Sequence, residues 1–147
     1  IEKYFSAFPQ AKEWIEHTKQ QALETGQVAT PFGRVRRFGF IGSNRNDVLR
    51  QAVNAPIQSL ASDITLSALI RAGKHLEGNN DTRLLLTVHD SILLETREDP
   101  VEVALWLRDV MEAPVLDGSV PFVADVSIGR TWGDLVPVEE YKKALVG

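Results

Sequence analysis

Apolar residues recur at helical spacing in the first part of the chain, with charged residues between them. The recurring positions are Tyr4, Phe5, Phe8, Ala11, Trp14, Ile15 and Ala22. This period predicts an amphipathic helix, and Gly26 is a typical stop for it. Residues 27–30 and 34–38 flank the turn-like Pro31-Phe32-Gly33, so we expect a small hairpin there, followed by a loop over residues 39–42.

A longer helical pattern follows that loop. Its candidate N-caps are Ser43, Asn44 and Asn46. Asp47 lies in the first turn, where the helix dipole favours a negative charge. The pattern continues to about Glu77, and Gly78-Asn79-Asn80 ends it. Pro56 lies inside the pattern, so we expect it to kink the helix or to divide it into two segments.

Two short apolar runs surround His89-Asp90-Ser91, and they predict two antiparallel strands joined by a tight turn. The runs are residues 84–88 and 92–96. A further helix is predicted from Pro100 through Met111. Residues 122–128 alternate as in a strand, with one face formed by Phe122, Ala124, Val126 and Ile128.

Trp132 and a short helix near residues 139–145 complete the predicted elements. Taken together, they predict an α+β fold. A small antiparallel sheet that contains the tight hairpin is expected to pack against the long kinked helix and the further helices.

The composition is that of a soluble globular protein. The chain has 147 residues, enough for one modest domain, of which 44% are hydrophobic and 24% charged. It contains no cysteine, which excludes disulfides and thiolate metal sites. No apolar run reaches the roughly 18 residues of a membrane span, and the start of the chain has no signal-peptide pattern. We therefore expect a protein that is neither membrane-bound nor secreted.

The charge is distributed unevenly along the chain. Residues 34–50 contain five arginines and one acid, a net charge of +4, which leaves −8 for the rest of a chain whose total is −4. Because screening confines electrostatic attraction to roughly 8–10 Å, a local arginine cluster on an acidic chain can still bind phosphates. A solvated surface paired to nearby acids is the alternative, but these acids are too few to pair all five arginines.

A polar stripe lies along the predicted long helix. Arg50, Asn54 and Gln58 are four residues apart and therefore share one helix face, with small residues around them. All three side chains donate hydrogen bonds, and the minor groove of DNA presents acceptors at equivalent places for every base pair. The stripe suits a protein that holds duplex DNA without selecting its sequence. An ordinary solvated helix face is the open alternative.

Asp90 is the candidate residue for metal chemistry. A turn between two apolar strands would project its carboxylate from the end of the sheet. Such a carboxylate is costly to bury unless it meets a cation, and Mg²⁺ usually takes one or two protein carboxylates and leaves room for phosphates. The alternative is an aspartate that only stabilises the turn. Of the other acids, Asp63 is expected to be a partnered buried residue of the fold, and Asp125 a solvated or paired one.

Three blocks of the chain resemble motifs of the family A, DNA polymerase I-like DNA polymerases. Residues 30–37, TPFGRVRR, resemble the T-x-x-G-R-x-R element, and residues 49–63, LRQAVNAPIQSLASD, are similar to the R-x-x-x-N-x-P-x-Q-x-x-A-x-D helix. Residues 87–92, TVHDSI, resemble motif C, V-H-D-E. The order and spacing of the blocks suit the family. Residues 126–129, VSIG, with Trp132 are similar to its closing strand, so the resemblance spans essentially the whole chain.

The resemblance implies a role for each candidate residue in a DNA-directed DNA polymerase, a nucleotidyltransferase of DNA replication. Asp90 would be one of two aspartates that hold two catalytic Mg²⁺ ions. Arg50, Asn54 and Gln58 would contact primer–template DNA in the minor groove, Arg34 would contact the DNA backbone, and His89 would lie by the primer terminus. The primer 3′-hydroxyl would attack the α-phosphate of a dNTP, and pyrophosphate would leave.

The same resemblance implies an incomplete active site. Residues 1–45 would form the end of the fingers and a connecting hairpin, and residues 46–147 the palm. The family's first catalytic aspartate and the fingers helix that holds the dNTP lie upstream of the matching region. The chain also begins at Ile1 rather than Met. We therefore expect part of a larger protein, inactive alone, which needs an upstream region on the same or a separate chain. It would work in the cytoplasm or wherever DNA is replicated.

Ser91 stands where motif C has its glutamate, so a second acid is missing there. A hydroxyl can hydrogen-bond a phosphate or a water molecule, but it binds a metal ion poorly. This difference keeps open the alternative of a non-catalytic DNA-binding module derived from a polymerase. A third hypothesis is an α+β interaction domain with coincidental motifs.

Overall fold

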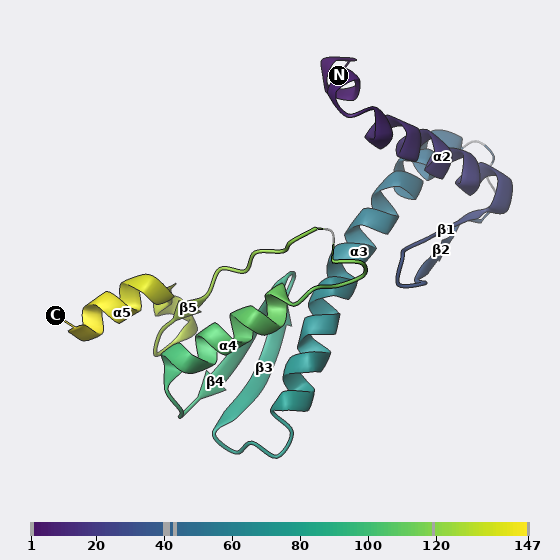
Figure 1. Ribbon diagram of the computed structural model, residues 1–147. Coiled ribbons are helices and arrows are strands. Elements are labelled where there is room, and N and C mark those ends of the chain that lie inside the picture. Colours follow the sequence, from purple (N-terminus) through teal and green to yellow (C-terminus); the bar gives the residue numbers. More distant parts are fainter. Residues whose placement is uncertain (1, 40–41, 43, 119, 147) are drawn as a thin grey trace. The chain divides into compact units, whose positions relative to one another are not determined.

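The computed structural model describes residues 2–39, 42, 44–118 and 120–146. Helices alternate with short antiparallel strand pairs, which confirms the α+β class (Figure 1). The described strands form three two-stranded sheets rather than the single small sheet that was expected. Contacts group the chain into two units, one ending at Asp63 and the other beginning at Ile64. This grouping does not test the assignment of residues 1–45 and 46–147 to fingers and palm, which stays a prediction.

The chain starts with two helices, α1 (Glu2–Ala7) and α2 (Pro9–Thr25), so the prediction of one helix is wrong. The break falls at Phe8, whose φ of −127° and ψ of 67° are not helical. Its cause is Pro9, which lacks an N–H donor and disfavours helical backbone at the residue before it. The predicted stop is confirmed: Gly26 has a φ of 68°, and its N–H donates to the Ala22 carbonyl oxygen.

The predicted hairpin after α2 is confirmed as β1 (Gln27–Ala29) and β2 (Val35–Arg37). Gly33, in the connecting turn, has a φ of 81°, a backbone conformation that glycine adopts without a steric penalty. β2 is exposed along its whole length, whereas Val28 of β1 is buried. The buried cluster of this unit consists of Ala22, Val28 and Ala52, with Phe38 packed against it.

The long helix is α3 (Arg45–His75). It begins directly after Asn44, whose carbonyl oxygen accepts hydrogen bonds from the N–H groups of Asp47 and Val48. Asp47 lies in the first turn, as predicted. Of the other candidate caps, Ser43 lies outside the described residues.

Pro56 lies within α3, which continues through it as one helix, so the predicted division into two segments is not observed (Figure 1). A proline costs the helix the one hydrogen bond that its N–H would have made, and the bonds on either side hold the remaining turns. The kink stays a prediction. The end of the helix is close to the predicted one, because His75 is its last residue and Gly78 has a φ of 82°.

The second unit contains the predicted tight hairpin, β3 (Thr82–Val88) and β4 (Ser91–Thr96). The two strands pair antiparallel, and a bulge at Leu85 shifts the register between Leu84 and Leu86. At the open end of the hairpin, the hydroxyls of Thr82 and Thr96 share a hydrogen bond of 2.6 Å. This bond and the strand ladder fix the base of the hairpin.

The helix predicted from Pro100 is α4 (Pro100–Glu112). Asp99 caps it, with Oδ1 accepting hydrogen bonds from the N–H groups of Val101 and Glu102 at 2.8 and 3.1 Å. α4 is held to the end of α3 at two points. Arg71 donates to the Val110 carbonyl oxygen at 2.9 Å, and the rings of His75 and Trp106 stack with centroids 4.6 Å apart.

The strand predicted over residues 122–128 is mostly wrong. Only β5 (Ser127–Ile128) pairs, with β6 (Val136–Pro137). The alternation itself is observed only over residues 124–128, where Ile128 is buried and Ala124 and Val126 are half-buried, whereas Val123 is 85% exposed. Phe122, expected on the same face as Ile128, is exposed. Alternating burial sets which side chains face inward, but a strand also needs a neighbouring backbone to pair with, and residues 121–126 are outside any described ladder.

The closing segment contains a short 3₁₀ helix (Trp132–Asp134), in which Trp132 is exposed, and α5 (Val138–Val146), the C-terminal helix that was predicted. A second buried cluster joins α4, β5 and α5. It consists of Ala104, Ile128 and Val138, with Val101, Val126 and Tyr141 packed against it. None of the described helices has both the length and the apolar character needed to cross a membrane.

Candidate functional site

Asp90 lies at the tip of the β3–β4 hairpin, in a turn of two residues. Val88 pairs with Ser91, so only His89 and Asp90 connect the strands. His89 has a φ of 55°, in the left-handed region that a two-residue hairpin turn requires. Ser91 closes the turn by donating from Oγ to the Val88 carbonyl oxygen at 2.8 Å. The side chains of His89 and Asp90 are both exposed.

The described residues fit a Mg²⁺ site only in part. Asp90 has an exposed carboxylate with no hydrogen-bond or ion-pair partner among them, which suits a ligand that is open to an ion. The same residues contain no group of three or more His, Cys, Asp or Glu side chains that could hold a metal ion. The Ser91 hydroxyl is engaged with the backbone of the turn. Within the described turn, Asp90 is thus the one residue that offers a carboxylate to an ion.

The polar stripe lies on α3, as predicted. Arg50, Asn54 and Gln58 are all exposed on this continuous helix. Within the described part of the chain, the amide side chains of Asn54 and Gln58 have no hydrogen-bond partners, so their donors are open to a ligand. Arg50 differs from them, because its Nη2 lies 2.5 Å from Oδ1 of Asp47, one helical turn earlier.

Asp47 also joins the stripe to the β1–β2 hairpin. Its Oδ2 accepts a hydrogen bond from Nε2 of Gln51 at 2.8 Å, and Oε1 of Gln51 accepts one from Nη2 of Arg36 at 3.2 Å. Arg36 and Arg50, two of the five arginines of residues 34–50, are thus linked through the carboxylate of Asp47 and the amide of Gln51. Sequence analysis missed this network. The spacing of Asp47, Arg50 and Gln51 could have indicated its helical half, whereas nothing in the pattern indicates the contact between Arg36 and Gln51.

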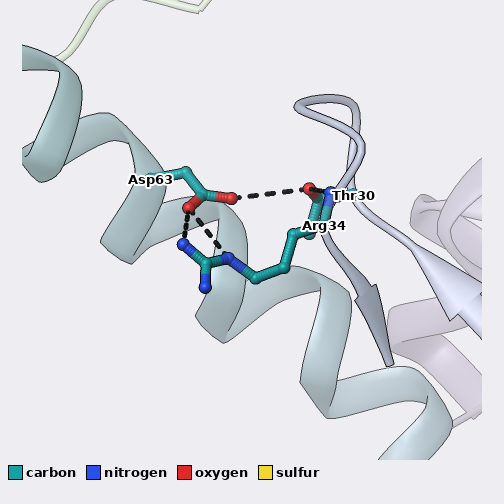
Figure 2. A network of polar contacts seen from close by, with 3 residues as sticks. All are labelled: Thr30, Arg34 and Asp63. Atoms are coloured by element: carbon teal, nitrogen blue, oxygen red, sulfur yellow. Dashed lines mark hydrogen bonds and ion pairs between the residues drawn. The ribbon is translucent and has the colours of Figure 1, made fainter. Parts of the chain in front are cut away.

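Arg34 is bound to α3 through Asp63 (Figure 2). Oδ1 of Asp63 accepts hydrogen bonds from Nε of Arg34, at 2.9 Å, and from Nη2. Oδ2 of the same carboxylate lies 3.5 Å from Oγ1 of Thr30. Asp63 is buried, which confirms the expectation of a partnered buried acid. Arg34, predicted to contact DNA, therefore also has an intramolecular partner 29 residues away.

The ionisation of this pair follows from its contacts. The hydrogen bond from Arg34 lowers the pKa of Asp63; burial opposes this shift, and the charge of Arg34 and the hydrogen bond from Thr30 add to it. The hydrogen bond to Asp63 and the charge of that carboxylate raise the pKa of Arg34, again against burial. Both shifts favour the ionised pair at neutral pH.

The candidate residues fall into the two units. Arg34, Arg50, Asn54 and Gln58 belong to the unit that ends at Asp63, and His89 and Asp90 belong to the other. Within the first unit, α3 carries the stripe and also the acid that binds Arg34. The expected approach of Asp90 to the Arg50 face stays a prediction.

Comparison with known proteins supports the motif resemblance. Residues 1–134 match the model of DNA polymerase family A. The chain is 38% identical over 147 residues to a DNA polymerase of Bacillus phage SP01, and this match covers 91% of the chain and 16% of that protein. It is 37% identical over 138 residues to the thermostable DNA polymerase I of Thermus aquaticus, with 90% and 16% covered. The chain thus spans about a sixth of the length of these curated relatives.

A solved structure is similar over most of the chain. It is the POL domain of Pol1 from M. smegmatis in complex with DNA primer–template and dNTP. The TM-score is 0.77 and the sequence identity 33%, over 89% of this chain and 24% of that one. The family model, the relatives and the fold agree over nearly all of the chain, which therefore belongs to DNA polymerase family A.

Proposed function

We infer that this chain works as a C-terminal segment of a DNA-dependent DNA polymerase. The reaction is template-directed nucleotidyl transfer: the primer 3′-hydroxyl gives its proton to water, and its oxygen bonds to the α-phosphorus of a dNTP. The bond from that phosphorus to the leaving oxygen breaks, and pyrophosphate departs. Membership in family A supports this activity, as does the similarity to a domain solved with primer–template and dNTP.

One observation carries the proposal: the Asp90 carboxylate is exposed on a two-residue turn, without a partner in the described part of the chain. In this proposal Asp90 supplies one ligand for Mg²⁺, and other ligands come from parts of the polymerase outside the described residues. Two such ions, when bound, stabilise the attacking and leaving oxygens. His89, next to Asp90, lies by the primer terminus.

The stripe has the task of holding the primer–template. Asn54 and Gln58 present amide donors to acceptors of the minor groove, and Arg50 adds a charged donor. These acceptors have the same positions in every correct base pair, so contact with them supports binding of any template sequence. Arg34 contacts a phosphate of the DNA backbone. The protein works where DNA is replicated.

A primer-extension assay tests the proposal on the complete polymerase that contains this chain. Asp90→Ala should lower the extension rate by about a hundredfold or more, because a metal ligand contributes several kcal/mol to the transition state. The Kd for primer–template should change by less than about threefold, since the carboxylate is not a DNA-binding group. Asp109→Ala, at an exposed position on α4, is the matched control and should extend at the wild-type rate.

The same assay decides the second candidate function, a DNA-binding module without catalysis. Ser91 favours this alternative, because it leaves the turn with one acid. Equal extension by the wild type and Asp90→Ala would exclude the catalytic role of Asp90. DNA binding by the wild type without any extension would favour the non-catalytic module.

A further inference from the structure

We propose that Asp63 is a positioning residue: it holds one edge of the Arg34 guanidinium so that the other edge faces a phosphate of the DNA backbone. The inference rests on the proposed function, since the phosphate belongs to the primer–template. Asp63 would then contribute to DNA binding as well as to the stability of the fold.

The geometry of the pair divides the guanidinium into two edges (Figure 2). Nε and Nη2 of Arg34 both donate to Oδ1 of Asp63. An arginine side chain has five N–H donors in a rigid planar fork, so three remain. Nη1 has no partner in the described part of the chain. The Asp63 side chain is 9% exposed and that of Arg34 is 53% exposed, so one edge is anchored in the protein and the other is accessible.

The backbone of Arg34 is held as well as its side chain. Its N–H donates to Oγ1 of Thr30 at 3.2 Å, and its carbonyl oxygen accepts from the N–H of Thr30 at 2.9 Å. Both ends of the side chain are thereby fixed before a ligand arrives. A pre-ordered donor loses less conformational entropy on binding, which increases affinity without a new contact.

A second acid–arginine pair among the described residues of this unit lacks these properties. Asp47 and Arg50 are both exposed, with 49% and 74% of their side chains accessible. Exposed pairs one turn apart on a helix are weak and are exchanged easily for water or a ligand. Burial of the carboxylate is therefore what distinguishes Asp63 as an anchor.

A role through charge alone would have the opposite consequence. Asp63 also cancels the charge of Arg34, so its neutralisation would leave a stronger positive field and tighter binding of DNA. Positioning requires that its neutralisation weakens binding, because the guanidinium is then free to turn. The sign of the change in affinity therefore separates the two roles.

The test is a double-mutant cycle on the complete polymerase, with the Kd for a primer–template duplex measured by fluorescence anisotropy at several salt concentrations. Asp63→Asn and Arg34→Ala should each weaken binding by about threefold to tenfold, the effect of one charge-assisted hydrogen bond partly screened by salt. Asp63→Asn should add nothing in the Arg34→Ala background. Arg34→Ala should also reduce the salt slope by about one unit. Glu139→Gln removes an equal charge from an exposed pair on α5 and should leave the Kd unchanged.

Arg34→Lys keeps the test decisive if Asp63→Asn does not fold. Lysine retains the charge but has no planar fork to share between two partners, so positioning predicts a loss close to that of Arg34→Ala. Wild-type affinity in Arg34→Lys, or tighter binding by a folded Asp63→Asn, would overturn the inference. So would an equal loss from Asp63→Asn with and without Arg34, since this would be a general effect on the fold.

The inference can fail independently of the proposed function. A wild-type protein that does not bind primer–template contradicts the proposed function itself. A wild type that binds and extends a primer, with Asp63→Asn unchanged in both respects, contradicts only the role of Asp63.

Discussion

The Ser91 hydroxyl donates a hydrogen bond to the Val88 carbonyl oxygen, 2.8 Å away, across the turn that carries Asp90. The hydroxyl thus stabilises the turn, at the position where motif C of the family has a glutamate. We expect Ser91→Ala to reduce primer extension by less than about tenfold, because it removes one exposed hydrogen bond worth about 0.5–1.5 kcal/mol. The measurement is single-turnover extension by the complete polymerase, with Asp90→Ala alongside. A loss in Ser91→Ala as large as that in Asp90→Ala would mean that the hydroxyl takes part in the chemistry.

Substitutions in the stripe on α3 should lower the affinity for DNA to a similar extent for every DNA sequence. Asn54→Ala and Gln58→Ala should each weaken primer–template binding by about threefold to tenfold, the value of one or two hydrogen bonds. The loss should be similar for duplexes of different sequence, because minor-groove acceptors are shared by all base pairs. Gln20→Ala, on α2, removes the same kind of side chain and should have no effect, since that amide is bonded to Glu24. Losses that vary strongly between sequences would contradict contact with the minor groove.

The contacts of Asp63 predict a dependence of stability on pH. Because the pKa of Asp63 is lower in the folded chain than its ordinary value of 3.8, the carboxylate stabilises the fold fully above that value. This contribution is lost as the pH falls from there through the lower folded pKa. The Tm difference between the wild type and Asp63→Asn should therefore be constant near neutral pH and should shrink below pH 3.8. Thermal unfolding at a series of pH values measures it, with Asp109→Asn as the exposed control. A difference that grows on acidification would contradict the ion pair.

We expect the position of Gly129 to tolerate no side chain. A Cβ there would lie 2.6 Å from the Asp134 carbonyl oxygen and 2.9 Å from the carbon of that carbonyl. Because backbone atoms cannot move away as a flexible side chain can, Gly129→Ala should destabilise the fold by about 1–3 kcal/mol. Gly133→Ala is the matched control, since its Cβ would be 3.9 Å from its nearest neighbour, Oγ1 of Thr131. Amide hydrogen exchange of β5 and β6 measures the local effect. Equal protection in the two variants would contradict the close approach.

Elements with strong local signals could be predicted from the sequence. Gly26 and Gly78 lie at helix ends because glycine adopts positive φ without a steric penalty. The tight turn also follows from the apolar runs on either side, although Ser91, expected in the turn, belongs to β4. The sequence rules failed where a proline interrupts a helical pattern, because periodicity predicts that the helix continues and proline predicts that it ends. Pro9 breaks a helical pattern at Phe8, whereas Pro56 lies within a continuous α3. Proline itself does not decide between these outcomes, because the turns around it determine whether one lost hydrogen bond ends the helix.

The candidate site, too, could be predicted from the sequence only in part. The sequence by itself determined the exposed stripe, because the period of a helix places Arg50, Asn54 and Gln58 on one face. It also determined that a carboxylate would occupy the tip of a hairpin. The sequence did not indicate that Asp63 binds Arg34, or that Gln51 bonds to Arg36, since each contact joins the β1–β2 hairpin to α3. Only the tertiary structure decided these partners, because periodicity describes neighbours along one element and a hydrogen bond between two elements depends on how they pack.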